Sequence, residues 1–568
     1  MLLNFFISLT MENKIHIYQA MVRLFGNRCL NNIPNGDMEQ NGCGLMNDFN
    51  EAALNVIADL GCNYIWYTGL IQHASKTTFP DAKVPHSTPS IVKGKAGSPY
   101  AINDYYSIHA ALASDPEKRF EEFEKLIERS HKAGLKVIID FVPNHVAREY
   151  DSSVQHPKHP NFGEFDRNDW HFAHDNNFYY FPGEEFRLAV EGGAEGYSEN
   201  PAKATGNNCF TPHPSINDWY ETIKLNYGID YSDCSRHFDP YPNTWHRMLD
   251  ILLYWCYFGI DGFRCDMAHM VPVEFWNWAI TEVKKQYPHV IFIGELYDHD
   301  IYRQYIEKGG FDLLYDKVGL YDTLRAIVTN QGSARDITRA WQRTEGLQSN
   351  MLYFLENHDE QRIASEFFAE DPFAAIPAMM VSAWMNTNST MIYFGQELGE
   401  SGMDSEGFSG KDGRTSIFDY WGLEKLSRLN NNGIWSDSNL TAQEKGLRDA
   451  YKKILTLAMT EKAISKGKFF DLMYANPDSL DFDGNKVYTF IRMEGEEFIL
   501  FVINFSSHNR FNKIYIPNHA FEHLNIAPKS YDYHDLLSDY QGSAYLDPDT
   551  QFEVETPKYG AVALKFCL

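Results

Sequence analysis

Eight short apolar runs separated by helical segments constrain the fold of this chain more than any other feature. The runs occupy residues 14–22, 63–70, 135–145, 259–268, 290–297, 311–318, 351–359 and 389–397. Amphipathic segments such as 119–134 and 244–259 lie between them. Such an alternation predicts parallel strands joined by helices. Eight repeats of it predict a closed (β/α)8 barrel, the TIM barrel of the α/β class.

Two regions depart from this alternation and predict additional domains. Residues 146–235 are rich in Pro, Gly, Asn, Asp and aromatic residues and are too long for an ordinary connection, so we expect an inserted subdomain after the third strand. From residue 465 only strand patterns follow, which predicts a C-terminal all-β sandwich. The expected domains are therefore the first part of the barrel (1–145), the insertion (146–235), the second part of the barrel (236–464) and the sandwich (465–568).

The aromatic residues of the predicted sandwich alternate along its strands, as core residues do. We therefore expect the sandwich to cap the barrel in preference to binding a ligand.

Charge and cysteine content narrow the partners and the compartment. A formal net charge of -27 argues against nucleic acid and anionic membranes as partners and favours a neutral or cationic ligand. No stretch of the sequence is long and apolar enough to span a bilayer. The eight cysteines are scattered without a C-x-x-C pair, which indicates reduced thiols and a cytoplasmic protein. Export is the alternative, if the apolar run in "MLLNFFISLTMENK" acts as a signal.

Polar and charged residues end four of the apolar runs. They are Asp140, Asn144 and His145 in the third run, Arg264 and Asp266 in the fourth, Glu295 in the fifth, and His358 and Asp359 in the seventh. The carboxyl ends of barrel strands meet on one rim around a cavity. One such carboxylate alone is more often a structural hydrogen-bonding group, and Arg264 with Asp266 alone could be a structural ion pair. Together these groups are costly to bury without a function, so we predict an active site on this rim.

Four motifs on this rim resemble a known family. "DFVPNH" (140–145), "GFRCDMAH" (262–269), "GEL" (294–296) and "ENHD" (356–359) are similar, in order and spacing, to the signature regions of the α-amylase family of glycoside hydrolases and transglycosylases. "GSPYAINDYY" (97–106) resembles the family segment that supplies a stacking tyrosine, and "MIYFGQE" (391–397) the last barrel strand. The resemblance covers nearly the whole chain. It implies a retaining hydrolase that cleaves α-glucosidic bonds, α-1,4 above all, in glucans or malto-oligosaccharides through a covalent glycosyl-enzyme.

The resemblance also implies roles for individual residues. Asp266 would be the nucleophile, Glu295 the general acid/base and Asp359 the stabiliser that grips sugar hydroxyls. Substrate-binding roles would fall to Tyr100, which stacks beneath the sugar, and to His145, Arg264, His269 and His358. A retaining mechanism needs an ionised nucleophile and a protonated acid. We expect Arg264 to hold Asp266 ionised, and apolar surroundings with nearby acids to keep Glu295 protonated. Asp140 would orient Arg264 or the neighbouring loop.

The chain departs from the usual family pattern after the nucleophile. Many relatives that act on α-1,4-glucans have Lys-His where this chain has His269 and Met270. The family's structural calcium is held partly by the asparagine matching Asn144 and partly by the backbone near this second position. A carbonyl of Met270 could still contribute, and the remaining ligands would lie in the insertion. The resemblance thus implies a structural calcium at Asn144 and no other cofactor.

Two other functions remain open at this stage. "DMAHMVP" (266–272) resembles stretches of glucan transferases of the same family as well as those of hydrolases, which makes a transglycosylase the first alternative. The second is a non-catalytic carbohydrate-binding or transporter-associated relative. The presence of all three carboxylates argues against the second.

Overall fold

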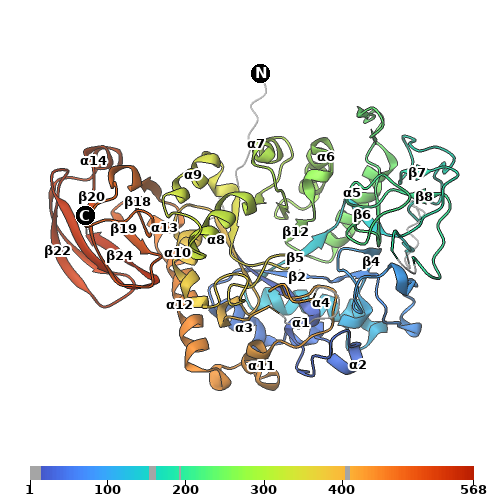
Figure 1. Cartoon of the computed structure of the whole chain (residues 1–568), viewed down its shortest axis with the longest axis horizontal. Coiled ribbons are helices and arrows are strands. Elements are labelled where there is room, and N and C mark those ends of the chain that lie inside the picture. Colours follow the sequence, from blue (N-terminus) through green and yellow to red (C-terminus); the bar gives the residue numbers. More distant parts are fainter. Residues whose placement is uncertain (1–13, 153–160, 191–192, 403–409, 568) are drawn as a thin grey trace.

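A closed barrel of eight parallel strands forms the centre of the computed structural model (Figure 1). The structure describes residues 14–152, 161–190, 193–402 and 410–567, so the apolar run at the start of the chain, with its bearing on export, lies outside them. The barrel strands are β1 (His16–Met21), β2 (Tyr64–Thr68), β5 (Lys136–Phe141), β12 (Gly262–Cys265), β13 (Ile291–Gly294), β14 (Leu313–Tyr315), β15 (Met351–Phe354) and β16 (Ser389–Tyr393). Each strand lies within one of the eight apolar runs, so the predicted barrel is confirmed.

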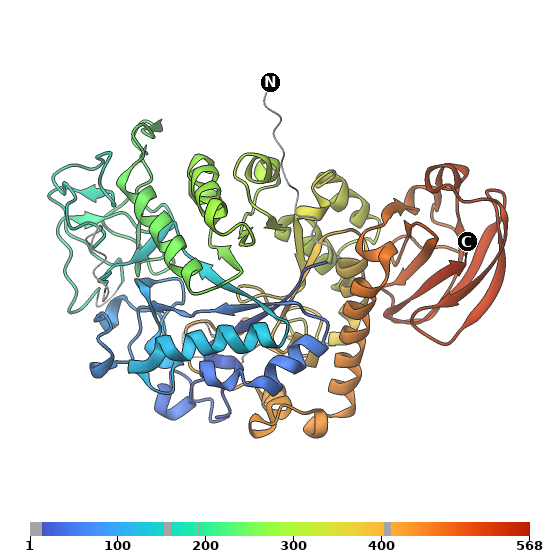
Figure 2. The ribbon, with the colours of Figure 1, turned by 180° about the vertical axis from the view of Figure 1, so that it is seen from behind.

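Helices surround this barrel on its outer side (Figure 2). The longer ones are α3 (Glu51–Asp59), α4 (Arg119–Lys132), α5 (Asn243–Tyr257), α6 (Val273–Gln286), α7 (His299–Glu307), α8 (Asp322–Val328), α9 (Asp336–Arg343), α10 (Ile376–Trp384), α11 (Glu424–Asn430) and α12 (Ala442–Thr460). The amphipathic segments expected at 119–134 and 244–259 are α4 and α5. None of the helices in the described ranges combines the length and apolar character needed to cross a membrane.

Strand β12 shows how the sequence separates the two faces of the barrel. Phe263 and Cys265 belong to the large core shared with the helices. Arg264 lies between them on the opposite face and is fully buried in the barrel interior, where it reaches other strands. Gly262 permits close strand packing, since a Cβ there would lie 2.7 Å from Cγ1 of Ile291. A second apolar cluster fills the interior of the barrel and consists of aliphatic and aromatic residues, many of them from the other barrel strands. It contains no residue of β12, because Arg264 is the side chain that β12 directs into the interior.

The insertion follows β5 and is built from short paired strands. Its pairs are β6 (His145–Ala147) with β9 (Thr222–Lys224), β7 (Tyr180–Phe181) with β8 (Ala202–Lys203), and β10 (Ile229–Asp230) with β11 (Ser235–Arg236). It shares a small apolar cluster with Ile91, which precedes β4, and a buried ion pair joins Arg148 to Glu199 at 2.8 Å. In the β6–β9 pair His145 lies opposite Lys224, which brings the end of the insertion back to the barrel rim.

A separate pair of antiparallel strands, β3 (Ile71–His73) and β4 (Ile102–Ile108), follows β2 and was not expected from the sequence.

The C-terminal part consists of two antiparallel sheets that face each other. The larger contains β17 (Lys468–Asp471), β18 (Val487–Glu494), β19 (Glu497–Asn504), β24 (Gly560–Cys567), β21 (Lys529–Asp535) and β22 (Gln541–Leu546), and the smaller contains β20 (Arg510–Tyr515) and β23 (Gln551–Thr556). The predicted sandwich is confirmed, although it also contains one short helix, α14 (Asn518–Leu524). This domain and the insertion lie at opposite ends of the molecule (Figures 1 and 2).

Arg492 on β18 ties the sandwich to the barrel. Its guanidinium is fully buried and donates hydrogen bonds to five backbone carbonyls, those of Trp384, Met385, Ala463, Ile464 and Gly467. Trp384 at the end of α10 also packs its ring 5.4 Å from that of Phe501. These contacts support a capping role for the sandwich.

Candidate active site

A cavity of about 290 Å³ opens at the carboxyl ends of the barrel strands. Asp266 and Glu295, which directly follow β12 and β13, line it together with Asp359. Of the residues predicted to bind substrate, Tyr100 and His145 also line it. The insertion supplies a further part of the wall, with Trp219, Glu221 and Thr222.

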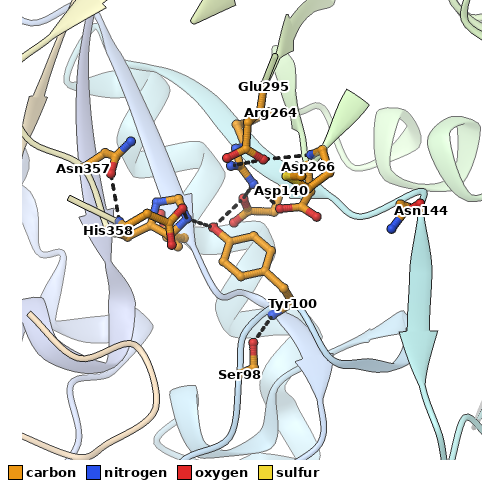
Figure 3. Close-up of polar contacts among 12 residues, drawn as sticks. Ser98, Tyr100, Asp140, Asn144, Arg264, Asp266, Glu295, Asn357 and His358 are labelled. Atoms are coloured by element: carbon orange, nitrogen blue, oxygen red, sulfur yellow. Dashed lines mark hydrogen bonds and ion pairs between the residues drawn. The ribbon is translucent and has the colours of Figure 1, made fainter. Parts of the chain in front are cut away.

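One buried guanidinium joins the two carboxylates at the centre of the site (Figure 3). Nη1 of Arg264 donates to Oδ1 of Asp266 at 2.8 Å, and Nη2 lies 2.7 Å from Oε2 of Glu295. Asp140 lies farther from the guanidinium, with Oδ1 3.7 Å from Nη1, and accepts the backbone N–H of Gly69 at 3.3 Å. Arg264 thus contacts Asp266, as expected, and the adjacent strand β13 brings Glu295 equally close to it.

The surroundings of the two carboxylates differ from each other. Burial raises the pKa of Asp266 well above its ordinary value; Arg264 lowers it, but the charges of Glu295 and Asp359 raise it further. Arg264 therefore favours the ionised form of Asp266, while burial and the two neighbouring acids oppose it. The surroundings of Glu295 are polar and not apolar as expected, because its Oε2 accepts the backbone N–H of Met267 at 2.8 Å and its Oε1 accepts the hydroxyl of Tyr297 at 2.6 Å.

Tyr100, His358 and Asp359 form a second hydrogen-bonded group beside the carboxylates. The Tyr100 hydroxyl lies 2.6 Å from Nε2 of His358, and the two rings stack with centroids 5.1 Å apart. The same Nε2 lies 3.0 Å from Oδ2 of Asp359. Desolvation would raise the pKa of Asp359, but His358 and the charges of Arg264 and Arg414 outweigh it and lower that pKa to about 2. Asp359 is therefore a fixed anion at working pH.

His145 lines the cavity from the first strand of the insertion. Burial and the charge of Lys224 lower the pKa of His145 to about 3, so its imidazole is neutral. Its ring lies 5.2 Å from that of Trp219. Asn144 lies apart from the carboxylates (Figure 3): its amide nitrogen donates to the carbonyl of Gly206 at 2.8 Å, and its amide oxygen accepts a hydrogen bond from the side chain of Lys224.

His269 is not brought into the cavity lined by the carboxylates. It is half-buried and lies beside Tyr297, with ring centroids 6.3 Å apart. It lines an adjacent cavity together with Met270. The structure therefore gathers the predicted residues around one site with the exception of His269 and Asn144.

Several residues of the site were missed by the sequence reasoning. Gln19 on β1 contacts Nδ1 of His358 at 2.8 Å, and its only signal was a polar residue within an apolar run. Tyr297 follows Glu295 by two residues and donates to it. Residues two apart in an extended strand point to the same side, and this rule, which linked Arg264 to Asp266, could also have identified Tyr297. Lys93 and Glu221 form an ion pair of 3.1 Å on the cavity wall, and neither carries a strand-end signal.

Comparisons with known proteins agree with this geometry. Residues 37–446 match the model of the α-amylase catalytic domain. The chain is 28% identical over 246 residues to an alpha-1,4-glucan:maltose-1-phosphate maltosyltransferase of Cereibacter sphaeroides, which covers 41% of this chain and 32% of that protein. It is 25% identical over 391 residues to alpha-amylase 3 of Dictyoglomus thermophilum, covering 65% of this chain and 68% of that protein. Alignments with the Cereibacter maltosyltransferases thus span only about a third of those proteins.

A solved structure with the same fold is that of the maltogenic alpha-amylase AmyB from Thermotoga neapolitana. It superposes with a TM-score of 0.63 at 19% identity and covers 98% of this chain and 99% of that one. Since the catalytic-domain model spans well over half of the sequence, the chain belongs to the α-amylase family.

Proposed function

We propose that this protein is a retaining glycoside hydrolase that cleaves α-glucosidic bonds, chiefly α-1,4 bonds, in glucans or malto-oligosaccharides. The observation that supports this most directly is the sharing of Arg264 by Asp266 and Glu295 in one cavity. Carboxylates that contact neighbouring nitrogens of one guanidinium must lie close together. Retaining enzymes hold their two carboxyl groups about 5–5.5 Å apart, whereas inverting enzymes need about 6.5–9.5 Å to admit a water.

In the first step Asp266 attacks the anomeric carbon and forms the glycosyl-enzyme, while the glycosidic bond breaks and Glu295 gives its proton to the oxygen of the departing sugar. The ion pair with Arg264 uses Oδ1 of Asp266, which leaves Oδ2 for the attack. In the second step Glu295 takes a proton from water, and the water oxygen displaces Asp266 from the sugar. Burial raises the pKa of Asp266, and the hydrogen bond and charge of Arg264 oppose this shift and so favour the ionised carboxylate that the attack requires.

The remaining groups would hold the sugar ring. Asp359, an anion with a pKa of about 2, can accept hydrogen bonds from sugar hydroxyls throughout the working pH range. Tyr100 offers its ring to the sugar face, and the neutral imidazole of His145 offers a polar contact on the side of the insertion. These contacts strengthen as positive charge develops on the ring in the transition state.

The substrate class rests on the relatives. One relative is named alpha-amylase and another alpha-1,4-glucan:maltose-1-phosphate maltosyltransferase, and we infer an α-glucan substrate from these names. The second name also favours one alternative function, transfer of the glycosyl group to another sugar in place of water. We further propose a cytoplasmic location, which the eight unpaired cysteine thiols support.

The test is a chromatographic product profile of the protein with maltoheptaose, run beside the Asp266→Asn variant. Hydrolysis predicts only shorter sugars and a gain of reducing ends. Transfer predicts shorter and longer sugars together without a net gain of reducing ends. An unchanged substrate in the presence of folded protein would refute the proposed substrate class.

A further inference from the structure

A buried lysine joins the insertion to two barrel strands beside the active site. Lys224, the last residue of β9, is 1% exposed. Its Nζ donates to Oδ1 of Asn144, which follows β5, and to the carbonyl oxygen of Met270, which follows β12, the latter at 3.2 Å. One amine nitrogen thus bridges three segments that are distant in the sequence.

These two oxygens are the ones that the family resemblance assigns to a structural calcium. Calcium takes six to eight oxygen ligands at about 2.3–2.6 Å, usually including carboxylates. Here the space between the two oxygens is occupied by Nζ of Lys224. Within the described part of the chain, no group of three or more His, Cys, Asp or Glu residues could hold a metal ion. The residues present therefore do not fit a calcium ion at Asn144.

The local geometry fits the lysine instead. The amide nitrogen of Asn144 donates to the carbonyl of Gly206 at 2.8 Å, which orients its amide oxygen toward Lys224. Burial lowers the pKa of Lys224 to about 7, and both the ammonium and the neutral amine can donate hydrogen bonds to two acceptors. The two oxygens are thus satisfied without a metal ion.

We propose that Lys224 takes the place of a structural cation in this chain and that the fold requires no calcium at this position. The contact also shapes the active site. His145 directly follows Asn144, and Thr222, two residues before Lys224, lines the catalytic cavity. Lys224 is therefore a positioning residue that holds the insertion side of the cavity against the barrel.

The first experiment needs neither turnover nor a variant, so its outcome is independent of the proposed activity. The purified protein is dialysed against EDTA, its calcium content is measured by mass spectrometry, and its Tm is recorded with and without millimolar calcium. We expect no stoichiometric calcium and a Tm that changes by less than about 1 °C, because only a ligand that binds the folded state raises Tm. Retained calcium, or a Tm that rises by several degrees on its addition, would overturn the proposal.

The second experiment tests the lysine itself. Lys224→Met retains the length of the side chain and leaves both oxygens without a donor, so we expect Tm to fall by roughly 2–5 °C. Chymotrypsin should then cleave within residues 146–235 at least about fivefold faster, because local opening governs proteolysis. Lys14→Met is the matched control: it removes an equally buried Nζ that donates to the carbonyl of Ala383 at 2.6 Å, far from the insertion. It should lower Tm without faster cleavage in 146–235.

Equal cleavage rates in the two variants would contradict the positioning role. If Lys224→Met does not fold, Lys224→Gln retains one amide donor and should show a smaller loss of Tm and a smaller gain in cleavage. The calcium measurements on the unmodified protein remain decisive in either case.

Discussion

Removal of the Tyr297 hydroxyl tests the assignment of Glu295 as the proton donor. This hydroxyl donates to Oε1 of Glu295 at 2.6 Å, while Oε2 faces Arg264 and the backbone of Met267. Tyr297→Phe deletes one of the donors to the carboxylate and retains the aromatic ring beside His269. The ionised form of Glu295 should lose more stabilisation than the protonated form, because a hydrogen bond to a charged acceptor is the stronger one.

The size of the effect follows from that hydrogen bond. A hydrogen bond to a charged group contributes about 1.5–3 kcal/mol, and about 1.4 kcal/mol corresponds to one pH unit in a titration. Because the protonated carboxyl loses a weaker hydrogen bond of about 0.5–1.5 kcal/mol, only the difference counts, and the alkaline limb of the kcat/KM profile, which reports the essential acid of the free enzyme, should move upward by about one pH unit.

The assay is kcat/KM on maltoheptaose across the pH range for the two proteins, with Tyr67→Phe as a control. Tyr67 is fully buried and its hydroxyl contacts Oγ of Ser130 at 2.7 Å, away from the cavity, so its loss should leave the profile in place. An alkaline limb that stays fixed or moves downward in Tyr297→Phe would refute the role given to Glu295.

Three further predictions follow from the structure. Asp266→Asn should lower kcat more than about a thousandfold while circular dichroism shows an unchanged fold. Glu295→Gln should lose activity on natural glucans but retain it on substrates with activated leaving groups, which need no proton. Full activity of either variant on a natural glucan would contradict these roles. The pKa of His16 is lowered to about 3 by burial and by Lys14, so between about pH 6.5 and 3 the unfolded chain binds a proton that the folded chain does not. The free energy of unfolding should therefore fall by about 1.4 kcal/mol for each pH unit below about 6.5. His16→Gln should remove this part of the pH dependence when unfolding by urea is measured at several pH values. Arg492→Met should destabilise the protein by at least about 3 kcal/mol in calorimetry, because it leaves five buried carbonyls without that donor, and an unchanged Tm would contradict the contact.

The barrel could be predicted from the sequence because its strands are buried on both faces. Every residue of β1, β2, β12 and β13 is buried, so each strand appears as a continuous apolar run. In the sandwich, β18 and β19 are almost fully buried and are apolar for the same reason. The pattern is weaker in β22 and β23, since most of their residues are exposed or half-exposed and polar residues interrupt it. Helix α14 was missed because it spans only seven residues.

The three carboxylates of the site could be predicted from the sequence, whereas Lys224 could not. The strand-end rule placed Asp266, Glu295 and Asp359 on one rim, and the structure brings all three to one cavity. Lys224 could not be found by this rule, because it lies 80 residues from Asn144 and reaches the rim only through the pairing of β6 with β9. A signal for such a partner would have to come from the fold of the insertion.

The most consequential difference between expectation and structure concerns Arg264. The two-residue spacing along the strand places Arg264 on the same face as Asp266. Arg264 also pairs with Ile293 of β13, and this register brings Glu295, two residues further along, within 2.7 Å of the guanidinium. Asp140 lies nearby on the third strand, so a single cation faces three buried carboxyl groups. Burial raises the pKa of Asp140 and of Asp266, as expected where anions outnumber cations in a desolvated site. Arg264 opposes these shifts and also donates a hydrogen bond to Oδ1 of Asp266, so the same guanidinium positions the nucleophile and favours its ionised form.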